Sequence, residues 1–348
     1  MEPPPRRRSK RASRVDPKAN VTTGVPIAPR QLSELAARHG GALANGASGL
    51  VRRLVPVKAA SAGDLAPLLA VRYLEDAIAA RARGALLLVD EALLARAEVR
   101  TLAAWIHPRA GWALASLLET ADAPELAPVI GEGCTIAASA VILPRVRIGN
   151  RVTVGPGAVV GAPGFGFTAD PDGVLRPIPQ LGGVVIEDDV HIGALCTIAC
   201  GTLGPTILRR GVKLDAQVHV GHNCEVGENT VIAAQSGLAG SVIVGRGVLM
   251  GGQVGIADHL RIGDGARIAA KSGVIGDVPA GGTVAGYPAV ERGRWLRGLA
   301  EMYRLVAARG DAPDTAPDMS VHAELGTPSR TPPPVSIHPA AIIRRQTP

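Results

Sequence analysis

From Leu214 to Val274 the sequence reads LDAQVHVGHNCEVGENTVIAAQSGLAGSVIVGRGVLMGGQVGIADHLRIGDGARIAAKSGV. Every sixth side chain in it is aliphatic or methionine, and the phase never slips. These side chains are Leu214, Val220, Val226, Ile232, Leu238, Val244, Met250, Ile256, Ile262, Ile268 and Val274. Such a period is typical of short strands that tight turns stack into a solenoid, whereas a β-sandwich would alternate with a period of two.

The same period continues towards the N-terminus. It places aliphatic side chains at Ile130, Ile136, Ile142, Ile148, Val154, Val160, Ile186, Ile192 and Ile198. We predict interruptions at residues 161–184 and 204–211. Glycine or alanine follows many of the aliphatic residues, and we expect these small residues to supply unusual backbone angles at the turns. Residues 125–290 are therefore predicted to form a left-handed parallel β-helix of hexapeptide repeats.

The remaining residues divide into four segments around this mainly β core. Residues 24–124 mix short helical and strand patterns and are predicted to form a small α/β domain. Residues 291–309 are predicted to form a basic C-terminal helix. We expect disorder in the basic tail, residues 1–23, and in residues 310–348, which are rich in Pro, Thr and Ser.

Within the small α/β domain, the local patterns predict four elements. A helix should begin near Gln31, and residues 72–83 should form a second helix. Residues 50–57 and 84–89 should form strands, the latter buried.

The composition fits a narrow interior and a protein outside the membrane. The 348 residues include 43 glycines but only 2% aromatic side chains, so the core must be built from aliphatic residues. The net charge of +7 lies partly in the N-terminal tail, which is either solvated or in contact with phosphate head groups or an acidic protein. No apolar run approaches the about 18 residues of a spanning helix, and no segment resembles a secretory leader. We therefore expect a cytoplasmic protein.

The four cysteines form no CxxC pair, so we expect neither a zinc site nor a disulfide framework. Cys134, Cys196 and Cys224 fall at the inward small positions of their repeats, where thiols serve as packing groups. Cys200 falls at a turn and has no evident histidine or metal partner.

Two histidines fall at turns of the predicted solenoid. His222 follows Val220 by two residues, and His259 follows Ile256 by three. The two aliphatic residues are 36 apart, which is two coils of three repeats, so both histidines should lie at one corner, about 10 Å apart along the axis. Gly240 occupies the turn position of His222 one coil later. An imidazole beside a backbone N–H suits acyl transfer to an amine, although a solvated turn histidine is the alternative.

The interruption at residues 161–184 holds both phenylalanines of the chain, Phe165 and Phe167. A loop expelled from a solenoid is often functional, because the coils themselves need no insertion. Packing against a neighbouring subunit is the alternative, and the two roles are compatible.

From about Val25 to Arg297 the chain resembles the UDP-3-O-(3-hydroxyacyl)glucosamine N-acyltransferases of lipid A biosynthesis. The matching motifs are Gly63-Asp64-Leu65, Gly164-Phe165-Gly166-Phe167, Ile178-Pro179-Gln180-Leu181-Gly182-Gly183, Val220-Gly221-His222-Asn223, Gly251-Gly252-Gln253-Val254-Gly255-Ile256 with His259, and Ala285-Gly286-Tyr287-Pro288. The resemblance implies a homotrimer with active sites between subunits, an N-terminal domain that holds uridine, and a C-terminal helix that helps to bind acyl carrier protein.

The resemblance also implies roles for individual residues. His222 would be the general base, and Gly240 would supply the backbone N–H for the oxyanion. His259 and Asn223 would assist, with His259 near the thioester or its pantetheine arm. The substrate contacts it implies are Tyr73, Phe165, Phe167 and Gln180.

The implied reaction moves a 3-hydroxyacyl group from the 4'-phosphopantetheine thioester of acyl carrier protein to the 2-amine of a 3-O-acylated UDP-glucosamine. No metal, redox cofactor or nucleic acid is implied, and the site of action would be the cytoplasm or the inner face of the inner membrane, with peripheral membrane contact. The chain departs from the family pattern at Pro67, Ala70, Ala199, Cys200 and Ala216. These departures leave open another sugar-amine acyltransferase of the acetyl-coenzyme A type, a diverged paralogue, or a non-catalytic scaffold.

Overall fold

The structure is a computed structural model that describes residues 23–121, 123–286 and 292–308. The chain divides into two compact units, Met1–Pro288 and Ala289–Pro348. Apart from Thr23, the predicted N-terminal tail lies outside the described residues, as do the predicted C-terminal tail and the Tyr287-Pro288 part of the last motif.

The first unit begins with a mixed sheet whose described strands run in the order β1-β3-β4-β5-β6-β2. Strands β3 to β6 are parallel, and β1 and β2 add antiparallel edges. The strands are β1 Val25–Gln31, β2 Ala42–Ala44, β3 Leu50–Leu54, β4 Asp64–Leu68, β5 Leu86–Asp90 and β6 Ala104–His107. The helices are α1 Leu32–His39, α2 Leu74–Ala82, α3 Ala97–Arg100 and α4 Ala110–Glu119, with 3₁₀ turns at Val71–Tyr73 and Glu91–Ala95.

Apolar side chains on both faces of this sheet are buried. Leu65 and Leu88 pack with α1 and α4, whereas Leu68 and Leu87 pack with α2. The sequence patterns predicted α1, α2, β3 and β5 but not the other strands and α-helices of this domain. One of the missed strands, β4, contains Pro67, which cannot donate a ladder hydrogen bond.

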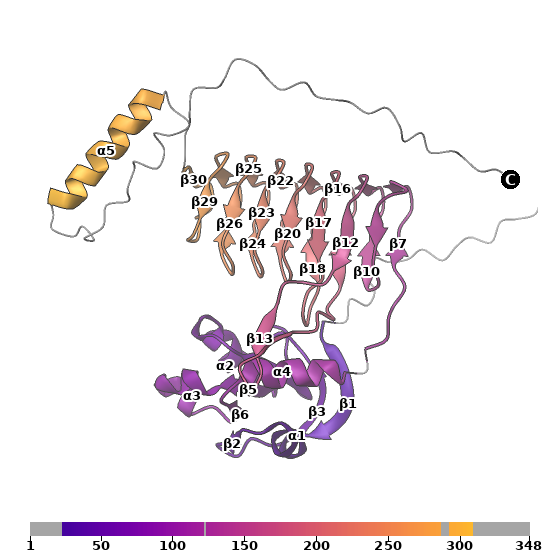
Figure 1. The fold of residues 1–348 in the computed structure, drawn as a ribbon. Helices are drawn as coiled ribbons and strands as arrows, with labels where there is room; N and C mark the ends of the chain where they lie inside the picture. The colour runs from indigo at the N-terminus through magenta and orange to yellow at the C-terminus, as the bar shows by residue number, and fades with distance from the viewer. Residues whose placement is uncertain (1–22, 122, 287–291, 309–348) are drawn as a thin grey trace, which may run out of the picture. The chain divides into compact units, whose positions relative to one another are not determined.

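The solenoid follows, and its rungs lie side by side in chain order (Figure 1). Its first sheet holds β7 Val129–Ile130, β10 Val146–Ile148, β15 Val184–Ile186, β18 Thr206–Leu208, β21 Glu225–Val226, β24 Ile243–Val244 and β27 Arg261–Ile262. The second holds β8 Thr135–Ile136, β11 Thr153–Val154, β16 His191–Ile192, β19 Lys213–Leu214, β22 Val231–Ile232, β25 Leu249–Met250, β28 Arg267–Ile268 and β30 Thr283–Val284. The third holds β9 Val141–Ile142, β12 Val159–Ala162, β17 Thr197–Ala199, β20 His219–Val220, β23 Gly237–Leu238, β26 Gly255–Ile256 and β29 Gly273–Val274.

Each of these sheets pairs residues one coil apart in parallel, as in the pairing of Val220 with Leu238. The inward side chains form one continuous buried core along the axis. The predicted left-handed parallel β-helix of hexapeptide repeats is therefore confirmed.

The second interruption is shorter than predicted. Leu208, inside the predicted break at residues 204–211, is fully buried and pairs with Ile186 and Val226. Ile198 and Leu208 are ten positions apart, four more than the period, so the inserted residues lie within 199–205. Leu203 in this insertion packs into the core of the N-terminal sheet, and its carbonyl accepts the N–H of Gly24 at 2.9 Å.

The predicted reason for glycine after the aliphatic residue holds at Gly161, whose φ is 93°, but is wrong at the other rungs. The positive φ angles lie two residues further on, as at Asn223 and His259. Gly221 is needed because the coils approach closely: a Cβ there would lie 2.7 Å from the carbonyl carbon of Ala239.

Small polar side chains at the inward positions bond to the next coil. The hydroxyls of Thr230 and Ser236 donate to backbone carbonyls at 2.8 and 2.9 Å, and the Cys224 thiol donates to Ala239 at 3.0 Å. Cys196 and Cys224 belong to the buried core, and Cys134 packs against it. Cys200, predicted at a turn, is buried, and its sulfur contacts the backbone of Gly183 and Gln180.

The second unit contains α5 Arg292–Ala308, which confirms the predicted C-terminal helix. Arg294, Arg297 and Arg304 are exposed on it, and Arg309 lies outside the described residues. In the part of the chain that the structure describes, no helix has the length and apolar character needed to cross a bilayer.

Candidate active site

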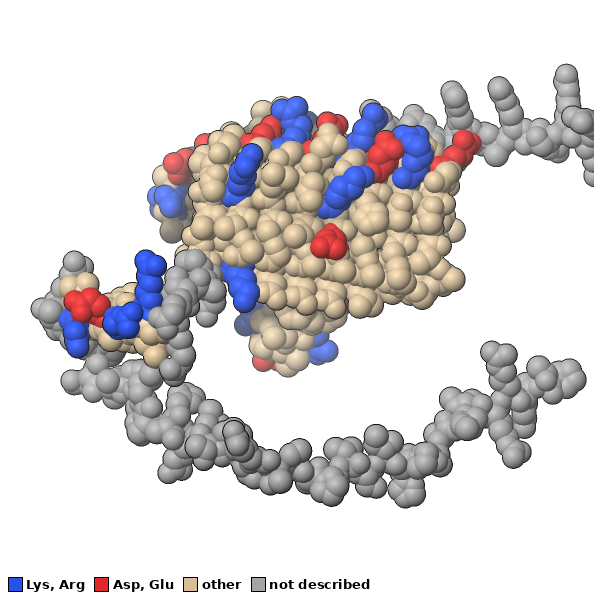
Figure 2. Space-filling model, turned by 90° about the horizontal axis from the view of Figure 1, so that it is seen from above, with Lys and Arg blue, Asp and Glu red and all other residues tan. Residues whose placement is uncertain are grey.

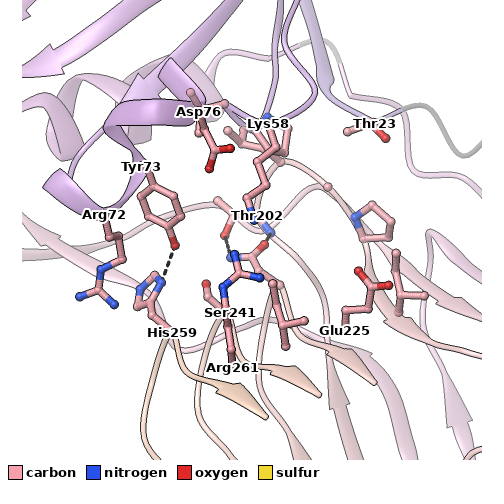
Figure 3. Close-up of a pocket in the computed structure, with 18 of the residues that line it drawn as sticks. Thr23, Lys58, Arg72, Tyr73, Asp76, Thr202, Glu225, Ser241, His259 and Arg261 are labelled. Atoms are coloured by element: carbon pink, nitrogen blue, oxygen red, sulfur yellow. Dashed lines mark hydrogen bonds between the residues drawn. The ribbon is translucent and has the colours of Figure 1, made fainter. Parts of the chain in front are cut away.

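A pocket of about 1180 Å³ lies between the N-terminal sheet and the solenoid. Its lining from the N-terminal side includes Thr23, Lys58, Pro67, Ala70, Arg72, Tyr73 and Asp76. Its lining from the solenoid includes Thr202, Arg209, Asn223, Glu225, Ser241, His259 and Arg261. Figure 3 shows several of these side chains facing one another across the space.

Next to this pocket, the turn after β20 carries His222 against Gly240. A Cβ built on Gly240 would lie 2.5 Å from Nε2 of His222, so the imidazole occupies the space above this glycine. The carbonyls of His222 and Gly240 each accept a hydrogen bond from a backbone N–H of the following coil, that of Ser241 at 2.8 Å and that of His259 at 3.0 Å. The structure thus brings together the two residues that the turn spacing had paired.

The N–H of Gly240 donates to no other group among the residues that the structure describes. At the same turn position elsewhere, the N–H groups of Asn150 and Arg246 are each capped at 2.8 Å by an aspartate of the next coil. Asp258 occupies the corresponding position above Gly240, but its carboxylate lies 3.7 Å from Nε2 of His259 instead. The Gly240 N–H is therefore free to donate a hydrogen bond to an external oxygen.

The first interruption folds over His222. A Cβ on Gly164 would lie 2.4 Å from Cβ of His222, which shows how closely the loop backbone covers the side chain. The loop continues into the hairpin β13 Phe167–Ala169 and β14 Leu175–Pro177. The rings of Phe165 and Phe167 pack edge to face with their centroids 5.0 Å apart, yet Phe165 is 87% exposed.

A chain of hydrogen bonds leads from this loop to His222. Gln180 accepts the hydroxyl of Thr202 at 2.8 Å, and Thr202 in turn bonds the side-chain amide of Asn223 through both its N–H and its oxygen. The Asn223 nitrogen lies 2.8 Å from Nδ1 of His222. The sequence analysis did not identify Thr202. The feature of the sequence that could have identified it is its place in the four-residue insertion.

Burial lowers the pKa of His222 below its ordinary value of 6.5, and the nearby His259 acts in the same direction. A hydrogen bond to the backbone of Phe165 opposes this shift. The net result favours a neutral imidazole near neutral pH, which is the form that can take up a proton.

Tyr73 and His259 bridge the N-terminal domain and the solenoid. The Tyr73 hydroxyl lies 2.6 Å from Nδ1 of His259, and their rings meet edge to face (Figure 3). Burial lowers the pKa of His259, with Arg72 adding to the shift. Burial also raises the pKa of Tyr73, so its hydroxyl stays protonated.

The pocket also holds cations that sequence reasoning missed. Lys58 and Arg72 come from the N-terminal side and Arg261 from the solenoid. Arg209 is already engaged with Glu187 and Glu225 at 2.9 and 2.7 Å. These cationic residues are far apart in the sequence, so no local motif predicts that they meet at one pocket.

Two departures from the family pattern, Pro67 and Ala70, line this pocket, whereas Ala199 and Cys200 are buried and Ala216 is partly buried. The Asp64 motif residue is also buried, where Arg53 and the N–H of Ser61 bond its carboxylate. Its role in this structure is to hold the turn before β4.

Among the described residues, no group of three or more His, Cys, Asp or Glu side chains could hold a metal ion. The lining of the pocket joins Tyr73, Asn223 and His259. His222 and Gly240 lie beside it, under the loop of Gly164. Phe167 contributes to a separate cavity of about 480 Å³.

The family model for bacterial transferase hexapeptide repeats (six repeats) matches residues 127–162 and 205–240. A UDP-3-O-acylglucosamine N-acyltransferase from Anaeromyxobacter dehalogenans is 48% identical over 181 residues, which is 51% of this chain and 51% of that protein. One from Chlorobium luteolum is 53% identical over 89 residues, which is 26% of this chain and 25% of that protein.

Among solved structures, a UDP-N-acetylglucosamine acyltransferase from Campylobacter jejuni aligns at 27% identity with a TM-score of 0.37, over 44% of this chain and 65% of that chain. The chain spans about half the length of the first curated relative and about a quarter of the second. The repeat match and these relatives confirm the resemblance predicted from the motifs: the chain is similar to the UDP-3-O-acylglucosamine N-acyltransferases and carries their hexapeptide repeats.

Proposed function

We propose that the protein is an N-acyltransferase that moves a 3-hydroxyacyl group from acyl carrier protein to the 2-amine of UDP-3-O-acylglucosamine, a step of lipid A biosynthesis. The observation that carries the proposal is the imidazole of His222 lying against Gly240, whose N–H has no partner among the described residues. The names of the relatives support the same reaction.

His222 is the general base in this proposal. As the amine attacks the thioester carbonyl, the imidazole takes a proton from the nitrogen. Collapse of the tetrahedral intermediate breaks the carbon–sulfur bond, and the leaving thiolate takes the proton from the imidazolium, which returns His222 to its neutral form. The Gly240 N–H donates to the oxyanion, a contribution that is typically worth about 10²- to 10³-fold in kcat for one donor. No metal or redox cofactor takes part.

The adjacent pocket is proposed to hold the UDP-sugar. Lys58, Arg72 and Arg261 supply positive charge for a diphosphate, since charge-assisted hydrogen bonds to phosphate are among the strong ones. Tyr73 and His259 stand at the same pocket, where they can contact the nucleoside or the acyl donor. Gln180 acts through Thr202, and Phe165 and Phe167 offer apolar surface to the substrate or to a neighbouring copy.

We propose a homotrimer, with the acyl carrier protein meeting the exposed arginines of α5. Figure 2 shows charged side chains gathered along one border of the visible face and few over the rest, which suits packing between copies. The proposed location is the cytoplasm, at the inner face of the inner membrane.

A second candidate is acyl transfer to a different sugar amine. Pro67 and Ala70 line the pocket at positions where the family usually carries an aromatic residue and an asparagine, so stacking and polar contacts to a uridine are reduced. The reaction chemistry at His222 would be the same.

The test is to incubate the full chain with acyl-loaded carrier protein and a panel of UDP-sugar amines, and to identify products by mass spectrometry. His222→Ala should reduce turnover by about 10²- to 10⁴-fold, the usual contribution of a general base, without changing the oligomer. His191→Ala removes an exposed histidine elsewhere on the solenoid and is the control. Unchanged turnover in His222→Ala would remove the catalytic assignment.

A further inference from the structure

The hydrogen bonds around Asn223 have a fixed direction. The N–H of Thr202 lies 2.7 Å from Oδ1 of Asn223, and a backbone N–H can only donate. The end of the amide that faces Thr202 N–H is therefore the oxygen, and the other end is the NH₂ group.

The opposite end of the network gives the same direction independently. The NH₂ group of Gln180 donates at 2.9 Å to the carbonyl of Ile178, which can only accept. The Gln180 oxygen therefore faces Thr202 and accepts a hydrogen bond from its hydroxyl at 2.8 Å. This leaves the Thr202 oxygen as the acceptor for Asn223 at 3.0 Å. Two backbone groups thus fix the orientation of both side-chain amides.

The direction of this network determines the tautomer of His222. The Asn223 NH₂ group lies 2.8 Å from Nδ1, so Nδ1 must present a lone pair, and the proton of the neutral ring sits on Nε2. Nε2 is also the atom nearest the space above Gly240.

We propose that Thr202 is a positioning residue that, through Asn223, holds free His222 as the Nε2–H tautomer, and that the Asn223 amide turns over to make Nε2 a base. After the turn, Oδ1 accepts a hydrogen bond from Nδ1–H. The Nε2 proton passes to water and Nδ1 takes one from water, so no net charge changes. The turn breaks both bonds between Asn223 and Thr202, the one from the Thr202 N–H and the one to the Thr202 hydroxyl oxygen, which is why Thr202 sets the balance. This inference rests on the proposed role of His222 as the base.

The insertion at residues 199–205 explains why Thr202 is available. In a regular rung, the residues after Ile198 would enter the next turn and strand. The four extra residues instead bring the backbone N–H of Thr202 against Asn223. The repeat needs no such insertion for its own packing.

The experiment is nitrogen-15 NMR of histidine-labelled full chain without substrate, with the His222 signal assigned by its loss in His222→Gln. The wild type should show the proton on Nε2; a proton on Nδ1 would overturn the proposal. Asn223→Asp places an acceptor against both Thr202 N–H and Nδ1, so the tautomer ratio should shift towards Nδ1–H by about tenfold or more. An unchanged ratio would also overturn it.

Thr202 is tested by a matched pair. Thr202→Val loses the oxygen that receives the Asn223 NH₂ group and should raise the Nδ1–H fraction, whereas Thr202→Ser keeps the hydroxyl and should match the wild type. Equal ratios in Val and Ser variants would remove the role of Thr202. Because these spectra need no substrate, they stand even if the acyl-transfer assay fails. If transfer is observed, kcat should rise in Asn223→Asp, and a fall to the level of Asn223→Ala would refute the need for amide turnover.

Discussion

Replacing Gly164 with alanine tests whether the loop covers His222 as the structure shows. The added Cβ would lie 2.4 Å from Cβ and 2.8 Å from Cγ of His222. Carbon atoms in contact normally stand about 3.5–4.0 Å apart, so the loop and the histidine must separate by about 1 Å. The nearest other atom is the Gln180 oxygen at 3.0 Å, which belongs to a flexible side chain and can give way.

The histidine cannot absorb this shift by changing rotamer, because its Cβ is fixed to the backbone. The carbonyl of His222 also holds the N–H of Ser241 at 2.8 Å, which ties the turn to the next coil. Overpacking of this kind costs about 1–3 kcal/mol of stability. A misplacement of about 1 Å at a reacting group can cost about 10²-fold in rate, so kcat should fall by that order while the fold persists.

The assay is single-turnover acyl transfer at saturating acceptor, with a thermal melt to follow stability. Gly237→Ala is the control, because a Cβ there meets no atom within 4 Å and the residue precedes Gly240 in the same coil. If the Gly164→Ala and Gly237→Ala variants had the same kcat, the placement of the loop over His222 would be refuted.

Three further predictions concern other groups. Tyr73→Phe removes the hydroxyl that bonds His259, so kcat/KM should fall by about two- to tenfold, the worth of one hydrogen bond; the exposed Tyr303→Phe is the control, and equal kinetics would contradict the bridge. Because the pKa values of His222 and His259 are lowered in the folded state, the unfolded chain binds more protons below pH 6.5. The contribution of these two groups to the free energy of unfolding is therefore complete above pH 6.5 and is lost as the pH falls further. In urea melts, the free energy of unfolding of His222→Gln should fall less steeply with decreasing pH than that of the wild type, and equal pH dependence of the two proteins would refute this. Burial raises the pKa of Cys224 to about 12, so iodoacetamide should label this thiol only after unfolding, and labelling of the native protein would contradict its burial.

The solenoid could be predicted because its physics repeats. Each rung offers one large inward position, and a polar side chain there, such as at Ile232 or Ile262, would leave an unsatisfied group in a closed core. The turn spacing also placed Gly240 beside His222, since the coil length is set by the same period. The α/β domain was harder to predict from the sequence. Pro67 disfavours a strand, yet it lies in β4, where tertiary packing within the sheet tolerates it.

Contacts across long sequence separations could not be predicted from a local pattern. The bridge from Tyr73 to His259 joins residues 186 positions apart, and it depends on how the N-terminal sheet meets the solenoid. The order of chain elements does not determine that meeting. It is fixed by individual contacts such as Leu203 entering the core beneath β1, which no periodicity encodes.

The two breaks in the period matter more for chemistry than the rungs do. Regular coils expose equivalent turns, and a histidine at any of them would lie against the backbone of the next coil. What distinguishes the turn of His222 is that both insertions converge on it: Gly164 covers the ring from one side, and Thr202 bonds its neighbour Asn223 from the other. Residues outside the repeat therefore affect the imidazole in two ways. They help to bury it, which lowers its pKa, and they form the hydrogen-bond network that directs its proton. The repeat supplies a rigid frame with an open amide at Gly240, and the departures from the repeat make one turn out of many competent for proton transfer.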